Sequence, residues 1–340
     1  MIVRSKAPLR LGLAGGGTDV APYSDLYGGA ILNATISMYA YATIQPRKDK
    51  RIILNSLDKK IEQEYKCGKE LEIDEHFSLA KGVYNRVVKD FVKEPLAFEL
   101  TTFVDAPPGS GLGTSSTLVV AILGAFAEWL NLPLGEYDLA HLAYEIERID
   151  LNMAGGKQDQ YAATFGGVNF MEFYKDDKVI VNPLRIKPIY LHELSYNLVL
   201  YNTETSRLSS KIIQAQSNNV MKKVSASIEA THNLKQQAIM MKEAILKGNL
   251  DKIGEILDYG WQNKKKMAKG ITNKMIDDIY ETATNNGATG GKVSGAGGGG
   301  FVIFYCPDNT RISVIEALKK FGGDIKRYDF TTQGLITWTL

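Results

Sequence analysis

The chain has 340 residues, of which 44% are hydrophobic and 23% charged. This length allows one large or two ordinary domains, and the composition is typical of a globular protein. The 40 basic and 38 acidic residues give a net charge of +2, without long runs of one sign. That balance argues against a dedicated nucleic-acid-binding protein, which concentrates positive charge on one face.

Two cysteines, Cys67 and Cys306, lie far apart and have no cysteine or histidine neighbour at metal-ligand spacing. We therefore expect neither a disulfide framework nor a zinc site. The first ten residues, MIVRSKAPLR, lack the apolar core of a signal peptide. No apolar run approaches the ~20 residues that span a bilayer. These features predict a cytoplasmic location and no membrane partner.

The first half of the chain predicts mixed strands and helices. Short strands are expected at 40–44, 51–54 and 96–104. The stretch 115–130 is rich in Ala and Leu and apolar on nearly all sides, so we expect a buried helix there. A second helix is expected over 136–149, and the chain returns through Gly166–Gly167 to a strand.

The second half changes character near 187 and is mostly helical. Helices are expected over 209–248, 251–269 and 273–286, with strands at 197–202 and 301–306 and a last helix–strand pair. Such a mixture suits a small α+β domain. We place a soft domain boundary near Ile186.

Three segments are unusually rich in glycine. We name them the first (11–19, LGLAGGGTD), second (107–116, PPGSGLGTSS) and third (292–300, KVSGAGGGG) glycine segments. Glycine adopts positive φ at little steric cost and lets a backbone approach a ligand closely. One such loop is usually a turn, but three beside regular structure favour a ligand-binding role.

The second glycine segment leads straight into the apolar helix, so its N–H groups and the positive end of the helix dipole converge. It is not a P-loop, because no Lys follows its last glycine, and Thr114 stands at the third glycine position of the dinucleotide fingerprint. The hydroxyls of Thr114, Ser115 and Ser116 can add hydrogen bonds or reach a metal. We therefore predict a phosphate site made of Pro108, Gly109, Ser110, Gly111, Leu112, Gly113, Thr114, Ser115 and Ser116.

In order and spacing, the three glycine segments resemble the motifs of the GHMP kinases, which include galactokinase, homoserine kinase and mevalonate kinase. The resemblance spans nearly the whole chain. It implies an α+β fold of two domains, an N-terminal domain like that of ribosomal protein S5 (1–186) and a ferredoxin-like C-terminal domain (187–340). It also implies that ATP binds between the domains and that, with Mg²⁺, its γ-phosphoryl group passes to an alcohol or phosphate acceptor.

The resemblance also implies catalytic roles for single residues. The segment AGGKQDQYAATFGG is similar to the galactokinase motif GIMDQ, whose Asp faces the acceptor hydroxyl, so Asp159 is the expected general base. Arg10 stands where galactokinases carry an arginine and could stabilise charge on the transferred group. Lys157 is either a solvated lysine or a substrate ligand, and the sequence leaves both open.

A metal site is implied in the same way. Ser115 matches the metal-binding serine of the family's loop, and Glu147 lies 12 residues before Asp159, as the metal-ligand Glu does in galactokinase. A carboxylate with a hydroxyl suits Mg²⁺, which takes its other ligands from water and phosphates. Glu145, the rival of Glu147, is expected in solvent on another face of the helix.

The expected acceptor is a sugar. Galactokinases have GEHTD where this chain has GGGTD, so Gly16 and Gly17 replace a Glu-His pair while Thr18 and Asp19 are kept. Asp19 is expected to hold sugar hydroxyls. Loss of two large side chains leaves room for a bulkier sugar and puts galactose in doubt.

The GGGTD motif and the segment around Asp159 most resemble one branch of the family. That branch phosphorylates the anomeric hydroxyl of heptose 7-phosphate or of fucose. We favour heptose 7-phosphate because the chain is compact, without an appended nucleotidyltransferase domain. The product would be the 1,7-bisphosphate, a precursor of nucleotide-activated heptose for surface polysaccharides such as capsule and lipopolysaccharide.

A phosphorylated acceptor needs a further cation. Arg207, which lies among Ser206, Ser209 and Lys211, has the composition of an anion site. The lysine run 264–266 beside Trp261 also has the composition of an anion site, but we expect that run to face solvent.

The expected partners are ATP and a sugar phosphate, not nucleic acid, and a homodimer stays open. One alternative is an inactive nucleotide- or sugar-binding protein, against which the joint presence of Asp159, Glu147 and Ser115 argues. Another is a kinase for mevalonate or homoserine, against which Asp19 argues.

Overall fold

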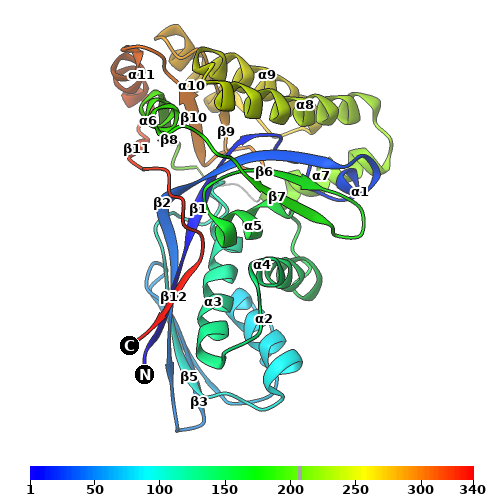
Figure 1. The fold of residues 1–340 in the computed structure, drawn as a ribbon, viewed down its shortest axis with the longest axis vertical. Coiled ribbons are helices and arrows are strands. Elements are labelled where there is room, and N and C mark those ends of the chain that lie inside the picture. Colours follow the sequence, from blue (N-terminus) through cyan, green and yellow to red (C-terminus); the bar gives the residue numbers. More distant parts are fainter. Residues whose placement is uncertain (206–208) are drawn as a thin grey trace.

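The computed structural model describes residues 1–205 and 209–340, which form two sheets with helices packed against them (Figure 1). The larger sheet has eight strands in the order β12-β1-β2-β5-β3-β4, with β6 pairing with β2 and β7 with β6. The smaller sheet has four strands in the order β11-β8-β10-β9. The mixture of sheets and helices confirms the expected α+β class.

The larger sheet consists of β1 (Val3–Ala14), β2 (Gly29–Pro46), β3 (Arg51–Ser56), β4 (Ile61–Lys66), β5 (Phe98–Val104), β6 (Val168–Phe173), β7 (Val179–Pro183) and β12 (Ile336–Thr339). The helices of the same half are α1 (Tyr23–Tyr27), α2 (Ser78–Val87), α3 (Thr114–Leu130), α4 (Glu136–Glu145) and α5 (Gln158–Phe165). The strands predicted at 40–44, 51–54 and 96–104 lie within β2, β3 and β5 or overlap them, so these predictions are confirmed.

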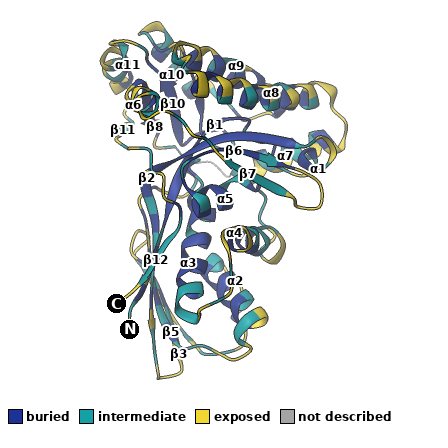
Figure 2. Ribbon diagram, in the orientation of Figure 1, coloured by how far each residue is buried: buried dark blue, intermediate teal, exposed yellow. Residues whose placement is uncertain are grey.

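Helix α3 is buried against the larger sheet, as its apolar sequence predicts. It packs on β1 and β2, and every residue from Val119 to Phe126 is buried. Much of α3 is accordingly dark blue in Figure 2. A helix that is apolar on all sides can only be stable in the interior. Its first turn therefore has a fixed position at the end of the second glycine segment.

The smaller sheet consists of β8 (Leu198–Asn202), β9 (Gly290–Val293), β10 (Phe301–Tyr305) and β11 (Asp324–Lys326). Its helices are α6 (Pro188–Asn197), α7 (Ser209–Met221), α8 (Ser225–Lys247), α9 (Ile253–Met267), α10 (Lys274–Asn285) and α11 (Thr310–Leu318). Side chains alternate between the two faces of a strand. Ile303 and Tyr305 of β10 therefore join the core shared with the larger sheet, whereas Val302 and Phe304 pack into a second core with residues of α10 and α11.

Two predicted helices differ in the structure. The helix predicted over 209–248 is divided into α7 and α8, and Lys223 between them has a φ of 53°, which an α-helix cannot accommodate. The helix predicted over 136–149 is α-helical only to Glu145 and continues as a π-helical turn, Ile146–Asp150. Such turns often occur at functional sites, and this one carries Glu147.

The end of the chain returns to its beginning. Strand β12 pairs antiparallel with β1, from Val3 opposite Thr339 to Lys6 opposite Ile336. The boundary predicted near Ile186 therefore separates the two sheets except for β12, and it stays a prediction. Among the residues that the structure describes, no helix is both long enough and apolar enough to cross a membrane.

Candidate active site

A cavity of about 520 Å³ lies where the three glycine segments meet. That volume is in the usual range of small-molecule sites. Each glycine segment contributes lining residues: Gly12, Gly16, Gly17 and Asp19 of the first, Gly109, Gly111, Gly113, Thr114, Ser115 and Ser116 of the second, and Lys292, Gly295 and Ala296 of the third. The remaining charged side chains of the lining are Arg10, Glu147, Arg148, Asp159 and Lys264.

Strand β1 brings Arg10 to the cavity at an irregularity in its pairing. The register of β1 with β2 shifts between Pro8 and Arg10, and the N–H of Arg10 donates to the carbonyl of Leu112 in the second glycine segment instead (3.1 Å). Irregularities of this kind redirect side chains and often occur next to active sites. The irregularity thus attaches the phosphate loop directly to the larger sheet.

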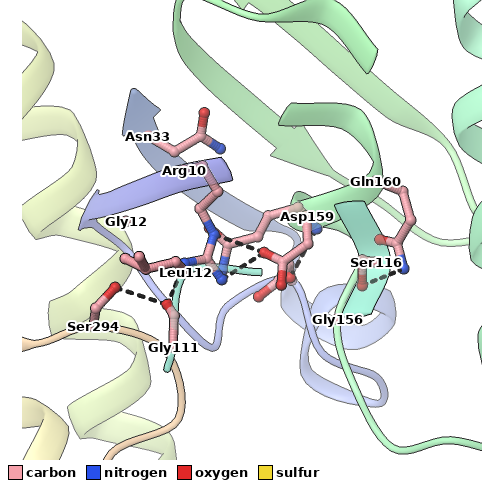
Figure 3. A network of polar contacts seen from close by, with 12 residues as sticks. Arg10, Gly12, Asn33, Gly111, Leu112, Ser116, Gly156, Asp159, Gln160 and Ser294 are labelled. Carbon is pink, nitrogen blue, oxygen red and sulfur yellow. Dashed lines mark hydrogen bonds and ion pairs between the residues drawn. The ribbon is translucent and has the colours of Figure 1, made fainter. Parts of the chain in front are cut away.

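Arg10 holds one oxygen of Asp159. Its Nε and Nη2 lie 2.7 and 2.6 Å from Oδ1 of Asp159, and Figure 3 shows the two side chains pointing toward each other. The other carboxylate oxygen, Oδ2, accepts no hydrogen bond from any described residue. Asp159 lies in the first turn of α5, where the helix dipole stabilises negative charge. An oriented carboxylate with one open oxygen can accept a proton from a ligand.

The second glycine segment ends at an uncapped helix N-terminus. Within the described chain, no side chain caps α3, and Gly113 before it adopts a left-handed conformation (φ 80°). The first N–H groups of α3 are therefore free to bind an anion. Thr114, Ser115 and Ser116 line the cavity at this point, whereas Ser110 and Leu112 of the segment are buried outside the lining.

The third glycine segment fixes the second. Ser294 and Arg10 both donate to the carbonyl of Gly111, at 2.8 and 2.6 Å (Figure 3). A Cβ on Gly111 would come within 2.4 Å of the carbonyl oxygen of Ser294, so only glycine allows this approach. The phosphate loop is therefore held between the two halves of the molecule.

Glu147 is fully buried and only partly bonded. Its Oε2 accepts from Nε2 of Gln160 at 2.5 Å, and Gln160 also donates to the hydroxyl of Ser116 (3.2 Å; Figure 3). Its Oε1 has no hydrogen-bond partner among residues 1–205 and 209–340, and Nη1 of Arg148 lies 3.7 Å away. A buried carboxylate oxygen without a donor fits the role of a metal ligand.

The cavity suits a metal that takes few ligands from the protein. The described residues contain no group of three or more His, Cys, Asp or Glu placed to hold a metal, so Glu147 and Ser115 would need ligands from the nucleotide and water, as is usual for Mg²⁺. Glu145 lies outside the lining and pairs with Arg86 at 2.5 Å. Of the two carboxylates, Glu147 is therefore the better metal-ligand candidate.

Asp19 lines the cavity but also has a structural task. Its Oδ2 accepts hydrogen bonds from the backbone N–H groups of Lys157 (2.9 Å) and Gln158 (3.1 Å), at the start of α5. Burial raises the pKa of Asp19, although the hydrogen bond from the N–H of Gln158 acts in the opposite direction. Only its second oxygen is left for the sugar hydroxyls that the sequence analysis assigned to it.

Two predicted substrate ligands point elsewhere. The ammonium of Lys157 is buried 2.6 Å from Asp177 and faces the ring of Tyr144, outside the lining. Residues two apart on a helix face different directions, so Lys157 does not accompany Asp159 into the cavity. The hydroxyl of Thr18 donates to the carbonyl of Ala30 and accepts from its N–H. These bonds fix the loop. Neither Lys157 nor Thr18 lines the cavity, so the structure does not support the substrate-binding prediction for them.

The sequence analysis assigned no site role to two lysines of the lining. Lys264, expected on a solvated face, is buried, whereas Lys266 of the same run is exposed. Lys292, at the start of the third glycine segment, is buried as well. Burial lowers the pKa of Lys264 to about 8 and that of Lys292 to about 7, and the charge of Lys264 contributes to the second shift.

The helical spacing of apolar residues could have indicated that Lys264 is buried. It follows Leu257, Gly260 and Trp261 at helical spacing, and all three are buried in α9. The predicted phosphate ligand Arg207 lies outside the described residues, as does its neighbour Ser206. Ser209, which was named with them, lines the cavity at the start of α7.

Comparisons with known proteins agree with this geometry. Residues 78–167 match the N-terminal domain of the GHMP kinases, and residues 241–324 match their C-terminal domain. The chain is 48% identical over 338 residues to the D-glycero-alpha-D-manno-heptose 7-phosphate kinase of Campylobacter jejuni, with 99% of both chains covered. It is 28% identical over 333 residues to L-fucokinase/L-fucose-1-P guanylyltransferase of Bacteroides fragilis, covering 90% of this chain and 35% of that one.

A solved structure gives the same result. The crystal structure of a D-glycero-D-manno-heptose 1-phosphate kinase from Bacteroides thetaiotaomicron superposes with a TM-score of 0.85 at 48% identity, over 99% of each chain. The chain therefore belongs to the GHMP kinase family of phosphotransferases, which use ATP as the phosphate donor.

Proposed function

We propose that this chain transfers the γ-phosphoryl group of ATP to the anomeric hydroxyl of D-glycero-D-manno-heptose 7-phosphate, which gives the 1,7-bisphosphate. The observation that carries the proposal is the carboxylate of Asp159, held by Arg10 through one oxygen and open at the other, beside an uncapped helix N-terminus. The names of the two relatives that are 48% identical support a heptose phosphate as acceptor. Their names differ in the position of the phosphate, so the site of phosphorylation has to be measured.

Asp159 is proposed as the general base. As the acceptor oxygen forms its bond to the γ-phosphorus, its proton passes to Oδ2 of Asp159, and the bond from the γ-phosphorus to the β–γ bridging oxygen breaks to release ADP. General-base catalysis contributes roughly 10²–10⁴-fold. Arg10 keeps Asp159 in place and adds positive charge beside the transferred group, where fixed charge stabilises the transition state.

The second glycine segment is proposed to bind the nucleotide. The free N–H groups at the start of α3 suit its phosphates, and the hydroxyls of Thr114 and Ser116 can supplement them. Ser115 and Glu147 would hold Mg²⁺, which neutralises negative charge on the β- and γ-phosphates when it is bound. The observation that supports this assignment is that Oε1 of Glu147 accepts no hydrogen bond from the described residues.

The test is a panel of acceptors with ATP and Mg²⁺, read by ADP release, with the product examined by ³¹P NMR. The expected result is turnover of heptose 7-phosphate and a new phosphorus signal coupled to the anomeric proton. A new signal at another carbon, or no turnover of the heptose phosphate, would overturn the proposal. Asp159→Asn serves as the inactive control.

L-fucose belongs in the panel because the B. fragilis relative carries a fucokinase name. Turnover of fucose without turnover of heptose 7-phosphate would make this chain a fucokinase. Nucleotide binding without turnover of any acceptor would indicate an inactive binding protein. A cytoplasmic location and a homodimer stay predictions of the sequence.

A further inference from the structure

We propose that Lys264 and Lys292 form a second anion subsite in the cavity, which binds the phosphate at the far end of the acceptor and not the phosphates of ATP. The inference rests on the proposed function, because it needs an acceptor with a phosphate remote from the reacting hydroxyl. It adds residues that determine which sugars the enzyme accepts.

The two ammonium groups converge on one point. A Cβ on Gly16 would stand 3.8 Å from Nζ of Lys292 and 3.9 Å from Nζ of Lys264. A Cβ on Gly17 would stand 3.3 Å from both Nζ of Lys264 and Oε1 of Gln216. Since neither glycine has a side chain, the space between the two cations stays open to a ligand.

The polar groups around this point are not satisfied by the protein. Lys264 donates to the carbonyl of Gly16 (2.8 Å) and Lys292 to that of Gly12 (2.7 Å), which uses one of the three N–H donors of each ammonium. Neither forms an ion pair with a described carboxylate. The Nε2 of Gln216 is buried and has no partner among the described residues either.

Two adjacent buried cations that form no ion pair are unfavourable on their own, although the charge of Asp19 offsets part of the cost for Lys264. A buried charge is costly unless it is paired, and the lowered pKa values of Lys264 and Lys292 have this cause. A phosphate placed between the ammonium groups would supply two negative charges and several acceptor oxygens. The arrangement therefore fits a dianion better than a neutral hydroxyl.

The position along the chain favours the acceptor over the nucleotide. The phosphate loop contacts β1 through Arg10, whose Nη1 donates to Gly111. Lys292 contacts β1 at Gly12, two residues further on, and Lys264 contacts the loop beyond it at Gly16. Both lysine contacts therefore lie on the first glycine segment, which also carries Asp19, whereas the free N–H groups proposed for the nucleotide belong to the second. The sugar would span the distance from Asp159 to Gly16.

The test compares three variants of the whole enzyme: Lys264→Met, Lys292→Met and, as a matched control, Lys266→Met on the exposed side of the same helix. Methionine keeps an unbranched apolar stem and removes the charge. For the first two we expect KM for heptose 7-phosphate to rise roughly ten- to a hundredfold, the size of a lost charge-assisted hydrogen bond. We expect the Kd of ATP, and the low turnover of unphosphorylated heptose, to stay within about twofold. Lys266→Met should match the unmutated enzyme.

A second measurement needs no variant. Inorganic phosphate should inhibit the unmutated enzyme competitively against heptose 7-phosphate and non-competitively against ATP. Competition against ATP, or equal damage to both sugars in the lysine variants, would overturn the subsite. Failure of the proposed function would be visible first, as absence of turnover of heptose 7-phosphate by the unmutated enzyme. Failure of the subsite would leave that turnover intact.

Discussion

Gly156 lies so close to Asp19 that a Cβ on residue 156 would come within 1.9 Å of the Oδ2 of Asp19. The same oxygen accepts the N–H groups of Lys157 and Gln158. The first glycine segment and the turn that carries Asp159 are therefore one rigid unit. The residue expected to hold the sugar also positions the residue expected to take its proton.

This double task predicts different results for two substitutions of Asp19. Asp19→Ala leaves two buried N–H groups without an acceptor, so the free energy of unfolding should fall by about 1–3 kcal/mol. Asp19→Asn keeps an acceptor oxygen and removes a charge that burial disfavours, as the raised pKa of Asp19 indicates. It should lose less stability than the alanine variant. Urea unfolding followed by tryptophan fluorescence measures both, and equal losses would contradict the structural task.

Asp159→Asn should strongly reduce turnover without unfolding the protein. The amide keeps the size of the side chain but cannot accept a proton as a carboxylate does, so kcat should fall roughly 10²–10⁴-fold. The Kd of ATP should change little, because Asp159 contacts Arg10 and not the free N–H groups of α3. A loss of kcat below about tenfold in a folded variant would remove Asp159 from the role of general base.

Glu147→Gln should alter the response to Mg²⁺. Glutamine can still accept the hydrogen bond from Gln160, so the fold should persist, but the negative charge on the oxygen that accepts no hydrogen bond is lost. The Mg²⁺ concentration for half-maximal activity should rise about tenfold or more. Glu145→Gln is the matched control because Glu145 pairs with Arg86 outside the cavity. Identical Mg²⁺ curves for all three proteins would exclude Glu147 as a ligand.

Acceptor binding should weaken as pH rises. In the free protein the pKa of Lys292 lies at about 7 and that of Lys264 at about 8, with Arg10 and Asp19 as the charged neighbours that act on them. A phosphate favours the charged lysines, so its binding above pH 7 should take up protons. Calorimetry at pH 8 in buffers of different ionisation enthalpy measures that uptake. Lys292→Met should reduce it, and absence of uptake by the unmutated protein would contradict these assignments.

The lowered pKa values of Lys264 and Lys292 also affect stability. The free energy of unfolding should rise with pH, whereas acceptor binding should weaken. An unfolded chain keeps both lysines protonated up to about pH 10.4, whereas the folded free protein releases their protons from about pH 7 upward. The unfolded state therefore binds more protons in this interval, and these two lysines make the free energy of unfolding increase with pH there. The increase should be smaller in Lys292→Met.

Local sequence patterns were sufficient to predict the elements whose composition is distinctive. Helix α3 is apolar on all sides and follows a glycine loop, so its burial and its uncapped start could both be predicted. Strand β1 was missed because its last four residues, 11–14, belong to the first glycine segment, which was interpreted as a loop. The break at Lys223 was missed because lysine is a good helix former and nothing nearby indicates a turn.

The cations of the site were the least predictable part. Charge runs usually face solvent, and only the spacing of Lys264 from Trp261 indicated otherwise. Lys157 differed in the opposite way. It lies two residues from Asp159 in the sequence, but its side chain does not point into the cavity. Burial of a single lysine depends on which segments pack around it, and those come from both halves of the chain.

The pairing of β12 with β1 also affects how this protein can be synthesised and divided. The N–H of Ile2 donates to the carbonyl of Leu340, and the N–H of Leu340 donates to that of Ile2. Strand β1 is synthesised long before residues 336–339, so its outer edge stays uncovered until they are made. A fragment cut near residue 186 would expose that edge, and unpaired edges promote aggregation. An isolated N-terminal half would thus need a short appended strand in place of β12 to remain monomeric.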